Sequence, residues 1–298
     1  MRKFPLMAGL AAISIIAGCL VNAEEISHDE VEEAAMHSEG AEKAVKNELA
    51  GVVNYKYYLD KGSSSILKKM KQMDMVIVDP VVMDKRYIKE AQQSGTIVYG
   101  YINAMEADKW NKNLFRQLEE SDFYHKDGKR VYFSQWDSYL TDMTSSKYQD
   151  VLIDEIKRQV ADKGLDGVFL DTVGNIDDQF SDNPETLKRQ QEAMKNFMKR
   201  IKSEFPELSI GQNWGFDTLT GYTSPYVDFI MWEDFDAPYI RSDNWSQEKI
   251  QELVKNREKY GTEVFTITFE DEERSRKIAE KYGFKNYYNP AGSYYNKW

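Results

Sequence analysis

Carboxylate side chains recur in this sequence directly after short apolar runs of the kind that form buried β-strands. Six acidic residues stand at or just beyond such runs: Asp60, Asp79, Glu106, Asp171, Glu233 and Glu270. Two carboxyl groups that face one another can donate and accept protons, and hydrolysis of a glycosidic bond needs such a pair but no metal, histidine or cofactor. The apolar strands that precede Asp171 and Glu233 make these two residues the best candidates for the pair.

The alternation of side chains along a strand adds a direction to these two candidates. Phe169 shares a strand face with Asp171, and Phe229 shares one with Glu233. If the apolar members point into a barrel, the carboxylates point into its mouth. For the other strand-end acids, capping of the following helix is an open alternative. Aromatic residues near strand ends, which could stack on sugar rings or simply pack, are Tyr58, Tyr101, Trp136, Trp214 and Trp232.

The elements that must position these residues alternate between short strands and amphipathic helices, the pattern of repeated βα units. Eight strands are predicted, over residues 52–59, 75–79, 97–103, 167–171, 208–213, 227–233, 263–269 and 285–288. Helices are predicted between them, over residues 63–71, 146–163, 185–204, 247–260 and 272–282, with a further one through Ile88 and Ala91. Eight such units in about 240 residues predict a single-domain α/β fold, the (β/α)₈ TIM barrel, whose active site lies at the carboxyl ends of the strands.

Composition excludes several other classes of function. The 298-residue chain has one cysteine and three histidines, so we expect no metal site built from thiolates or imidazoles and predict no cofactor. The same count argues against a deacetylase with a histidine-rich metal centre. The formal net charge is −11, and nucleic acid is not an expected partner because phosphate binding requires clustered Lys and Arg.

The N-terminus has the pattern of a secretion signal. Arg2 and Lys3 precede a short apolar run that ends in residues 16–19, Ile-Ala-Gly-Cys. This ending resembles the bacterial lipobox, so Cys19 is the predicted site of lipidation, and the protein is expected on the extracellular face of a bacterial membrane, held there by its lipid anchor. The alternative is an ordinary signal, cleaved near residues 21–23, and a freely secreted protein.

Three regions follow from these patterns. Residues 1–18 are predicted to be a lipoprotein signal peptide, and residues 19–49, which are rich in Glu, an acidic flexible tether. Residues 50–298 contain all eight predicted strands and are assigned to the barrel.

Five segments, in order along the chain, also resemble a known family. They are residues 75–79 (MVIVD), 98–103 (VYGYIN) together with Glu106, 164–173 (GLDGVFLDTV), 210–213 (IGQN) and 227–233 (VDFIMWE). They are similar to the barrel domain of glycoside hydrolase family 114, which contains the endo-α-1,4-polygalactosaminidases. The resemblance covers most of the chain from about residue 50 to about residue 290, as expected for a whole barrel.

The resemblance implies roles for individual residues. Asp171 would be the nucleophile and Glu233 the acid/base. The resemblance also implies a sugar site lined by Asp79, Tyr101, Glu106 and Asn213. Further substrate contacts are predicted at neighbouring strand-end positions, namely Asp60, Asn103, Gln212 and Trp214.

The implied substrate is an α-1,4-linked, galactosamine-containing exopolysaccharide, cut internally, and our working hypothesis is a retaining mechanism. A de-N-acetylated amino sugar is cationic, so an acidic mouth would attract it. Two departures from the family pattern, at Ala104 and Gly174, fall at the rim and bear on substrate identity. The alternative function is a lipoprotein that binds exopolysaccharide on the same barrel without cleaving it.

Overall fold

The computed structural model describes residues 48–298. Eight parallel strands form one sheet in the order β1-β2-β3-β9-β10-β11-β12-β13. Their bounds are Tyr55–Tyr58 (β1), Met75–Val78 (β2), Ile97–Asn103 (β3), Gly167–Asp171 (β9), Ser209–Asn213 (β10), Phe229–Trp232 (β11), Glu263–Thr268 (β12) and Lys285–Tyr288 (β13). All eight predicted strands are therefore present, each within a few residues of its predicted bounds.

The sheet curls into a nearly closed barrel. Among the described residues no backbone ladder joins β13 to β1, and side chains bridge the seam instead. The Tyr55 hydroxyl donates to the backbone oxygen of Thr266 at 2.7 Å, and the Lys56 ammonium donates to the Tyr287 hydroxyl. The predicted TIM-barrel fold is confirmed.

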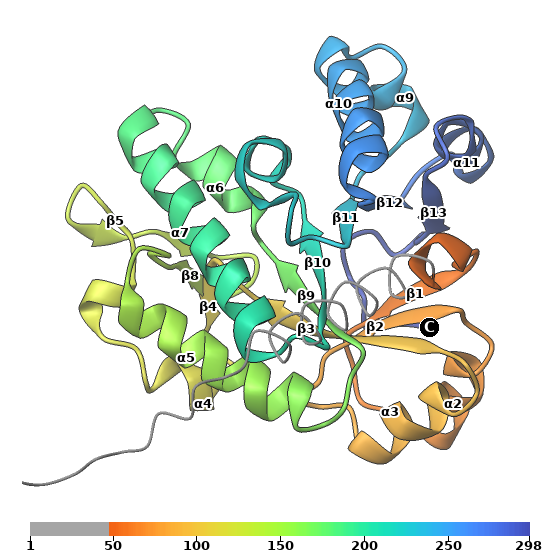
Figure 1. Cartoon of the computed structure of the whole chain (residues 1–298), viewed down its shortest axis with the longest axis horizontal. Coiled ribbons are helices and arrows are strands. Elements are labelled where there is room, and N and C mark those ends of the chain that lie inside the picture. The colour runs from red at the N-terminus through yellow and green to blue at the C-terminus, as the bar shows by residue number, and fades with distance from the viewer. Residues whose placement is uncertain (1–47) are drawn as a thin grey trace, which may run out of the picture. The chain divides into compact units, whose positions relative to one another are not determined.

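Helices surround the strands in Figure 1. The longer ones are Ser64–Met70 (α2), Lys85–Gln92 (α3), Ser146–Ile156 (α5), Pro184–Glu204 (α7), Asn244–Tyr260 (α10) and Glu272–Lys281 (α11). Short helices near the strand ends, which the sequence patterns do not predict, are Lys112–Phe115 (α4), Gly174–Gln179 (α6), Phe216–Thr218 (α8) and Ala237–Ile240 (α9). The helix predicted over residues 146–163 is α5 continued by a π-helical turn, Lys157–Ala161.

Each of these six longer helices begins at a side chain that accepts a hydrogen bond from the first turn, which satisfies one of the free backbone N–H groups there. These capping residues are Ser63, Asp84, Ser145, Asn183, Asp243 and Asp271. Gly164, directly after the segment 146–163, has φ +76°, the left-handed conformation that glycine adopts without strain.

A long excursion between β3 and α5 carries small antiparallel elements. Glu106–Asp108 (β4) pairs with Ser138–Leu140 (β8), which pairs with Tyr132–Phe133 (β7). His125–Lys126 (β5) and Lys129–Arg130 (β6) form a hairpin. Asp127 and Gly128 form the turn at its tip.

Large side chains at alternate strand positions fill the barrel interior: Tyr55, Tyr57, Met75, Ile77, Tyr99, Phe169, Phe229, Met231, Phe265 and Ile267. Two glycines make room for these rings. A Cβ at Gly167 would lie 2.3 Å from the Tyr99 ring, and one at Gly211 would lie 2.2 Å from the Phe229 ring. The interior is therefore packed, and the inward-facing residues at the carboxyl ends of the strands are free to form a site.

The boundary between tether and barrel needs one correction. Leu49, assigned to the tether, is 1% exposed and belongs to the apolar cluster of the barrel interior, and residues 48–51 are helical. An apolar side chain that is buried this completely belongs to the folded body. The predicted signal peptide, the rest of the tether and Cys19 lie outside the described residues. Within residues 48–298, no helix combines the length and apolar character that a membrane span needs.

Candidate active site

A cavity of about 970 Å³ opens at the carboxyl ends of the strands. Nine of the ten predicted site residues line it: Asp60, Asp79, Tyr101, Asn103, Glu106, Asp171, Asn213, Trp214 and Glu233. They come from the ends of β1, β2, β3, β9, β10 and β11 and from the loops that follow them. The barrel thus brings together residues that lie far apart in the sequence, as the fold predicts.

One asparagine connects the two carboxylates of the predicted pair. The Asn213 Nδ2 atom donates to Asp171 Oδ1 at 2.6 Å and to Glu233 Oε1 at 2.6 Å. An amide nitrogen carries two hydrogens, so both bonds can form at once. Since the two bonds share one nitrogen, these two oxygens cannot lie farther apart than the sum of the bonds, about 5.2 Å.

Asp171 accepts hydrogen bonds from three directions. Besides Asn213, the backbone N–H of Thr172 donates to its Oδ1 at 2.7 Å, and the Tyr101 hydroxyl hydrogen-bonds the same carboxyl group. Burial raises the pKa of Asp171, and these three donors oppose that rise because they stabilise the carboxylate form.

The surroundings of Glu233 favour its protonated form more strongly. Burial, followed by the negative charge of Asp171, raises the pKa of Glu233 to about 7. Hydrogen bonds from Tyr295 and Asn213 act in the opposite direction. Two neighbouring carboxyl groups do not both ionise readily in a buried site, and the one with fewer donors is the one that keeps the proton.

The backbone turns sharply after each of the three residues of this bridge. The residue that follows each of them has a positive φ: Thr172 at +61°, Trp214 at +54° and Asp234 at +58°. Left-handed geometry is rare for a β-branched residue such as Thr172 and costs free energy, so other contacts must hold it. The Thr172 hydroxyl donates to Asn103 Oδ1 at 2.6 Å and accepts from the Met105 N–H at 2.9 Å.

Gln212 is a correction to the sequence-based site. Its side chain is fully buried outside the cavity lining, where Nε2 donates to the backbone oxygens of Trp214 at 2.8 Å and Gly215 at 2.9 Å. Neighbouring residues on a strand face opposite ways, so Gln212 must point outward when Asn213 points inward. Gln212 holds the loop that carries Trp214 and does not reach the cavity.

Of the remaining strand-end candidates, some line the cavity and others do not. Tyr58 and Trp232 are 5% and 1% exposed and pack in the layer between strands and helices, whereas Trp136 lines the cavity. Glu270 is exposed and lies outside the cavity lining, and the adjacent Asp271 caps α11.

A second group of acids lies beside Asp171, at the ends of β2 and β3. Glu106 is 5% exposed and accepts hydrogen bonds from Ser138 and, at 2.8 Å, from Asn175. Asp108 is not among the residues predicted from the sequence, although it stands two residues beyond Glu106 on the same short strand. Burial, strengthened by the charges of Glu106, Asp171 and Asp79, raises the pKa of Asp108 to about 7.

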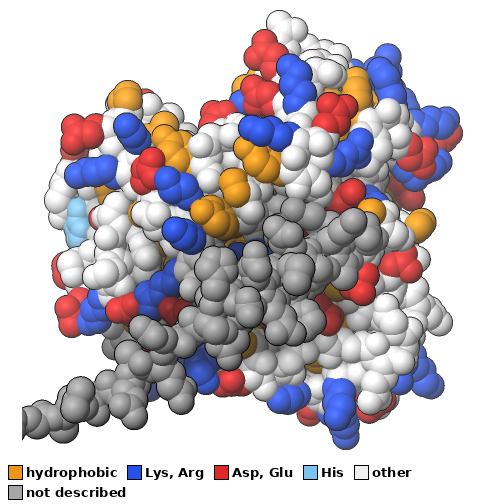
Figure 2. Space-filling view, in the orientation of Figure 1, with side chains coloured by type: hydrophobic (Ala, Val, Ile, Leu, Met, Phe, Trp, Pro, Cys, Tyr) orange, Lys and Arg blue, Asp and Glu red, His pale blue; other side chains and the backbone are white. Residues whose placement is uncertain are grey.

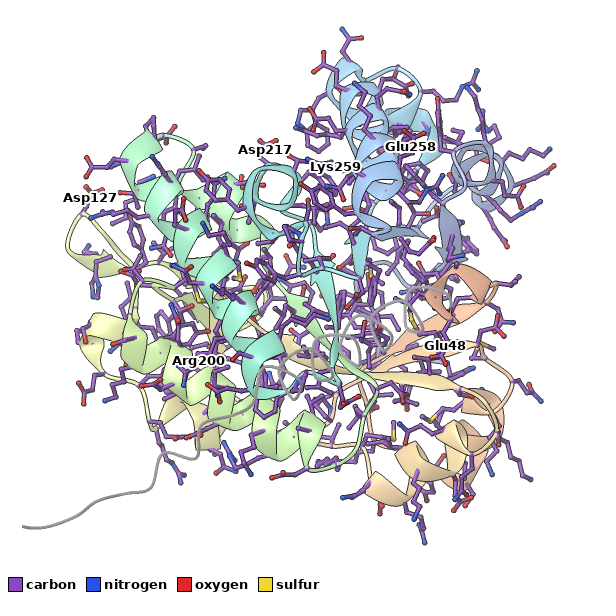
Figure 3. All side chains as sticks on the ribbon, viewed as in Figure 1. Glu48, Asp127, Arg200, Asp217, Glu258 and Lys259 are labelled. Carbon is purple, nitrogen blue, oxygen red and sulfur yellow. The ribbon has the colours of Figure 1, made fainter. Side chains whose placement is uncertain are left out.

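The cavity lining is strongly acidic. Nine carboxylate residues line it: Asp60, Asp79, Glu106, Asp108, Asp171, Asp177, Asp178, Asp217 and Glu233. Among the described residues, Lys249 is the one Lys or Arg that lines the cavity. Its ammonium group forms ion pairs with Asp217 at 2.5 Å and with Glu252 at 2.8 Å, which neutralise its charge. On the face shown in Figure 2, by contrast, acidic and basic side chains are interspersed. Figure 3 labels Asp217, a residue of α8 that lines the cavity. The site therefore favours a neutral or cationic ligand.

Five aromatic rings stand at the rim of the cavity, of which Trp214 is half-buried and the other four are exposed. Trp214 and Trp245 lie nearly parallel, with centroids 6.4 Å apart and an interplanar angle of 19°. Trp136 and Tyr294 form another pair, with centroids 5.9 Å apart, and Trp110 is 49% exposed. Large apolar rings that remain exposed beside a polar cavity are typical of a ligand-binding surface.

The family model of glycoside hydrolase family GH114 matches residues 35–293. The chain belongs to family GH114. It is therefore a glycoside hydrolase, and the resemblance seen in the sequence motifs is confirmed. A search of curated protein sequences finds no match.

Solved structures share the fold of this GH114 enzyme. The glycoside hydrolase domain of PelA from Pseudomonas aeruginosa matches with a TM-score of 0.60 and 16% identity, over 82% of this chain and 97% of that one. Ega3 from Aspergillus fumigatus, in complex with galactosamine, matches with a TM-score of 0.59 and 17% identity, over 80% and 92%. The α-galactosidase TtGalA from Thermus thermophilus matches with a TM-score of 0.55 and 11% identity, over 81% and 59%. At these identities the likeness shows the barrel fold.

Proposed function

We propose that this glycoside hydrolase cleaves a galactosamine-containing polysaccharide internally, by a retaining double displacement in which Asp171 is the nucleophile and Glu233 the acid/base. The observation that supports this most strongly is the shared Asn213 donor, which limits the separation of the two carboxylate oxygens to about 5.2 Å. Retaining enzymes hold their carboxyl groups about 5–5.5 Å apart, whereas inverting enzymes leave roughly 6.5–9.5 Å for a water molecule.

In the first step Asp171 attacks the anomeric carbon while Glu233 transfers its proton to the glycosidic oxygen. The bond from that carbon to the leaving oxygen breaks, and the sugar becomes an ester of Asp171. In the second step Glu233, now a carboxylate, takes a proton from water, whose oxygen attacks the same carbon and releases Asp171. Two inversions leave the anomeric configuration unchanged.

The hydrogen bonds support this division of roles. The attacking group must be ionised, and Asp171 is the carboxylate with the larger number of donors. The acid must be protonated before it acts, and burial beside Asp171 raises the pKa of Glu233 to about 7. The raised pKa of Glu233 and the donors that favour the carboxylate form of Asp171 together support a proton on Glu233 rather than on Asp171.

The charge of the cavity supports a cationic amino sugar as substrate. Nine carboxylate residues against one paired lysine attract a polymer that carries free ammonium groups. The similar barrel of Ega3 was solved with galactosamine bound, which supports the same sugar class. The aromatic pairs at the rim would stack on further sugar units along a chain, as internal cleavage requires.

We also propose that the enzyme acts at a membrane surface, where Cys19 carries a lipid anchor and the acidic tether separates anchor from barrel. The support comes from residues 16–19 and from the Glu-rich segment after them. An anchored enzyme would act on polymer that lies close to the bacterial surface.

Purified protein is to be assayed on de-N-acetylated and fully acetylated α-1,4-galactosamine polymers, with mass spectrometry of the products. We expect the wild type to release a ladder of oligomers from the de-N-acetylated polymer. Asp171→Asn and Glu233→Gln should each lose activity about 10³-fold or more, because each removes one half of the pair. Glu270→Gln, an amide change at a strand-end acid outside the cavity, should cut normally. Full activity in either of the first two variants would refute the assignment.

A further inference from the structure

The segment that follows β13 returns to the cavity and contributes Tyr295 to its wall. The Tyr295 side chain is 8% exposed, and its ring stacks on Tyr57 with centroids 4.0 Å apart. The backbone oxygen of Tyr295 accepts from the Leu59 N–H at 2.7 Å, so this segment is fixed to the end of β1. The family model ends its match at residue 293 and does not include Tyr295.

The hydroxyl of Tyr295 donates to Glu233 Oε2, while Asn213 donates to Glu233 Oε1. Both oxygens of the carboxyl group are therefore held in place. A carboxyl oxygen has two lone pairs, so Oε2 can accept from Tyr295 on one of them and still carry a proton on the other. Tyr295 can thus keep its bond to Glu233 whether or not Glu233 carries a proton, and that proton remains available to the glycosidic oxygen.

We propose that Tyr295 is the positioning residue of the acid/base: it keeps Glu233 aimed at the glycosidic oxygen in the protonated state and stabilises the carboxylate that accepts a proton from water. This inference rests on the function proposed above for Glu233. The segment after β13 is then a part of the active site, and it also connects β13 with the end of β1.

The groups around Glu233 determine whether its pKa rises or falls when one of them is removed. Asp171 and Asp234 bear negative charge and favour the protonated form of Glu233, while Tyr295 and Asn213 favour the ionised form. The phenols of Tyr55 and Tyr57 lie near the same carboxylate. Burial and Glu233 itself hold the pKa of Tyr295 well above its usual range, so its hydroxyl stays protonated at working pH. Loss of this donor must raise the pKa of Glu233 further.

Tyr295→Phe removes the hydroxyl and leaves the ring stacked on Tyr57. We expect kcat on the polymer to fall about tenfold or more with KM little changed, and the basic limb of the kcat/KM profile to move up by about one pH unit. A substrate with an activated aryl leaving group needs little proton donation, so the loss in its kcat/KM should be smaller. The matched control is Tyr239→Phe, which removes a hydroxyl from a side chain that is 61% exposed and outside the cavity lining.

A second variant tests the same bond without removing it. A fluorinated tyrosine at position 295 is a stronger donor, so the basic limb should move to lower pH, opposite to the shift in Tyr295→Phe. An unmoved limb in both variants would overturn the inference, even if kcat falls, because a purely structural role does not change the titration of Glu233. If Tyr295→Phe alone behaves like wild type while Glu233→Gln remains inactive, this inference fails and the proposed function stands. If Glu233→Gln is fully active, the proposed function fails first.

Discussion

Asp171 and Glu233 accept hydrogen bonds from the same atom, Asn213 Nδ2, at 2.6 Å each. The two carboxyl groups come from β9 and from the end of β11, on either side of β10, which carries their common donor. Because the groups are buried and adjacent, they titrate as a pair. The amide of Asn213 therefore limits the distance between the two bonded oxygens and favours the ionised form of each group.

Replacement of that donor tests its part in the pair. Asn213→Asp puts a third carboxyl group between two others and removes a donor from each. We expect kcat/KM at pH 7 to fall about 10³-fold, with partial recovery at lower pH, where a proton can bridge the three groups. The pH dependence of kcat/KM in both proteins measures this. Wild-type rates at pH 7 in Asn213→Asp would contradict the bridge.

The same pair should make the protein less stable as the pH rises. The folded-state pKa of Glu233 is raised to about 7 from a usual value of 4.5, so the folded state holds a proton that the unfolded chain releases. Stability from this group is therefore full below pH 4.5 and declines up to about pH 7. Glu233→Gln, which cannot ionise, should exceed the wild type in unfolding free energy at pH 8 by roughly 3 kcal/mol and match it near pH 4.5. Thermal unfolding at the two pH values measures the difference. An equal Tm for Glu233→Gln and the wild type at pH 8 would show that ionisation of Glu233 does not destabilise the folded protein.

The strand periodicity in the sequence was sufficient to predict this pair. Phe169, Asp171, Phe229 and Glu233 alternate as barrel-interior residues should, and the structure has them on inward faces. The same rule, applied to adjacent residues, would have excluded Gln212, since it stands next to Asn213 on one strand. A position near the end of a strand does not by itself show on which face of the strand the side chain lies.

Thr172 allows backbone strain and side-chain contacts to be separated. Thr172→Gly relieves a left-handed conformation worth about 1–2 kcal/mol but removes the hydroxyl bonds to Asn103 and Met105, at about 1 kcal/mol each. We expect a small change in Tm and a fall in kcat of about tenfold, because the loop after β3 loses its link to β9. Thr172→Ser keeps the hydroxyl and should keep the activity.

Asp127 supplies the control for that experiment. It has φ +53° at the tip of the β5–β6 hairpin, outside the cavity lining, where Figure 3 labels it. Asp127→Gly makes the same change of backbone strain and should leave kcat unaltered. Equal losses of activity in Thr172→Gly and Thr172→Ser would show that the hydroxyl has no such role.

The acidic lining predicts a salt effect that depends on substrate charge. With de-N-acetylated polymer, kcat/KM should fall about tenfold between low salt and 0.3 M NaCl. At the higher salt, counterions screen the attraction between charges that lie farther apart than the Debye length, which is then less than about 10 Å. With a neutral acetylated oligomer, any residual kcat/KM should vary little. Initial rates over a NaCl series measure both, and an equal salt response would argue against recognition of ammonium groups.

Residues beyond the strands carried less information in the sequence. Tyr295 stands in an irregular segment after the last strand, and no periodicity connects it with Glu233, because that contact spans 62 positions and arises only when the barrel closes. Asp108 could have been found from its spacing to Glu106, but its burial depends on how the excursion after β3 folds back. The contact of Tyr295 with Glu233 and the burial of Asp108 both depend on how distant segments come together in the folded chain, and not on a local sequence pattern.

The proposed lipid anchor makes a separate prediction about Cys19. Full-length protein expressed in a bacterial host should partition into the membrane fraction, and Cys19→Ala should abolish this partitioning while the barrel remains active. Fractionation and mass spectrometry of the mature N-terminus measure the outcome. Release of wild-type protein with an unmodified N-terminus near residues 21–23 would support the ordinary signal peptide instead.

The stereochemistry of the first product tests the central claim most directly. Proton NMR can follow the anomeric signals in the first minutes of polymer hydrolysis, before mutarotation mixes the two forms. A carboxyl pair held by one amide nitrogen predicts that the α-anomer of the new reducing end appears first, since the α-linkage is cleaved with retention. Initial appearance of the β-anomer would mean that water attacks directly, and would contradict the role of Asp171 as nucleophile.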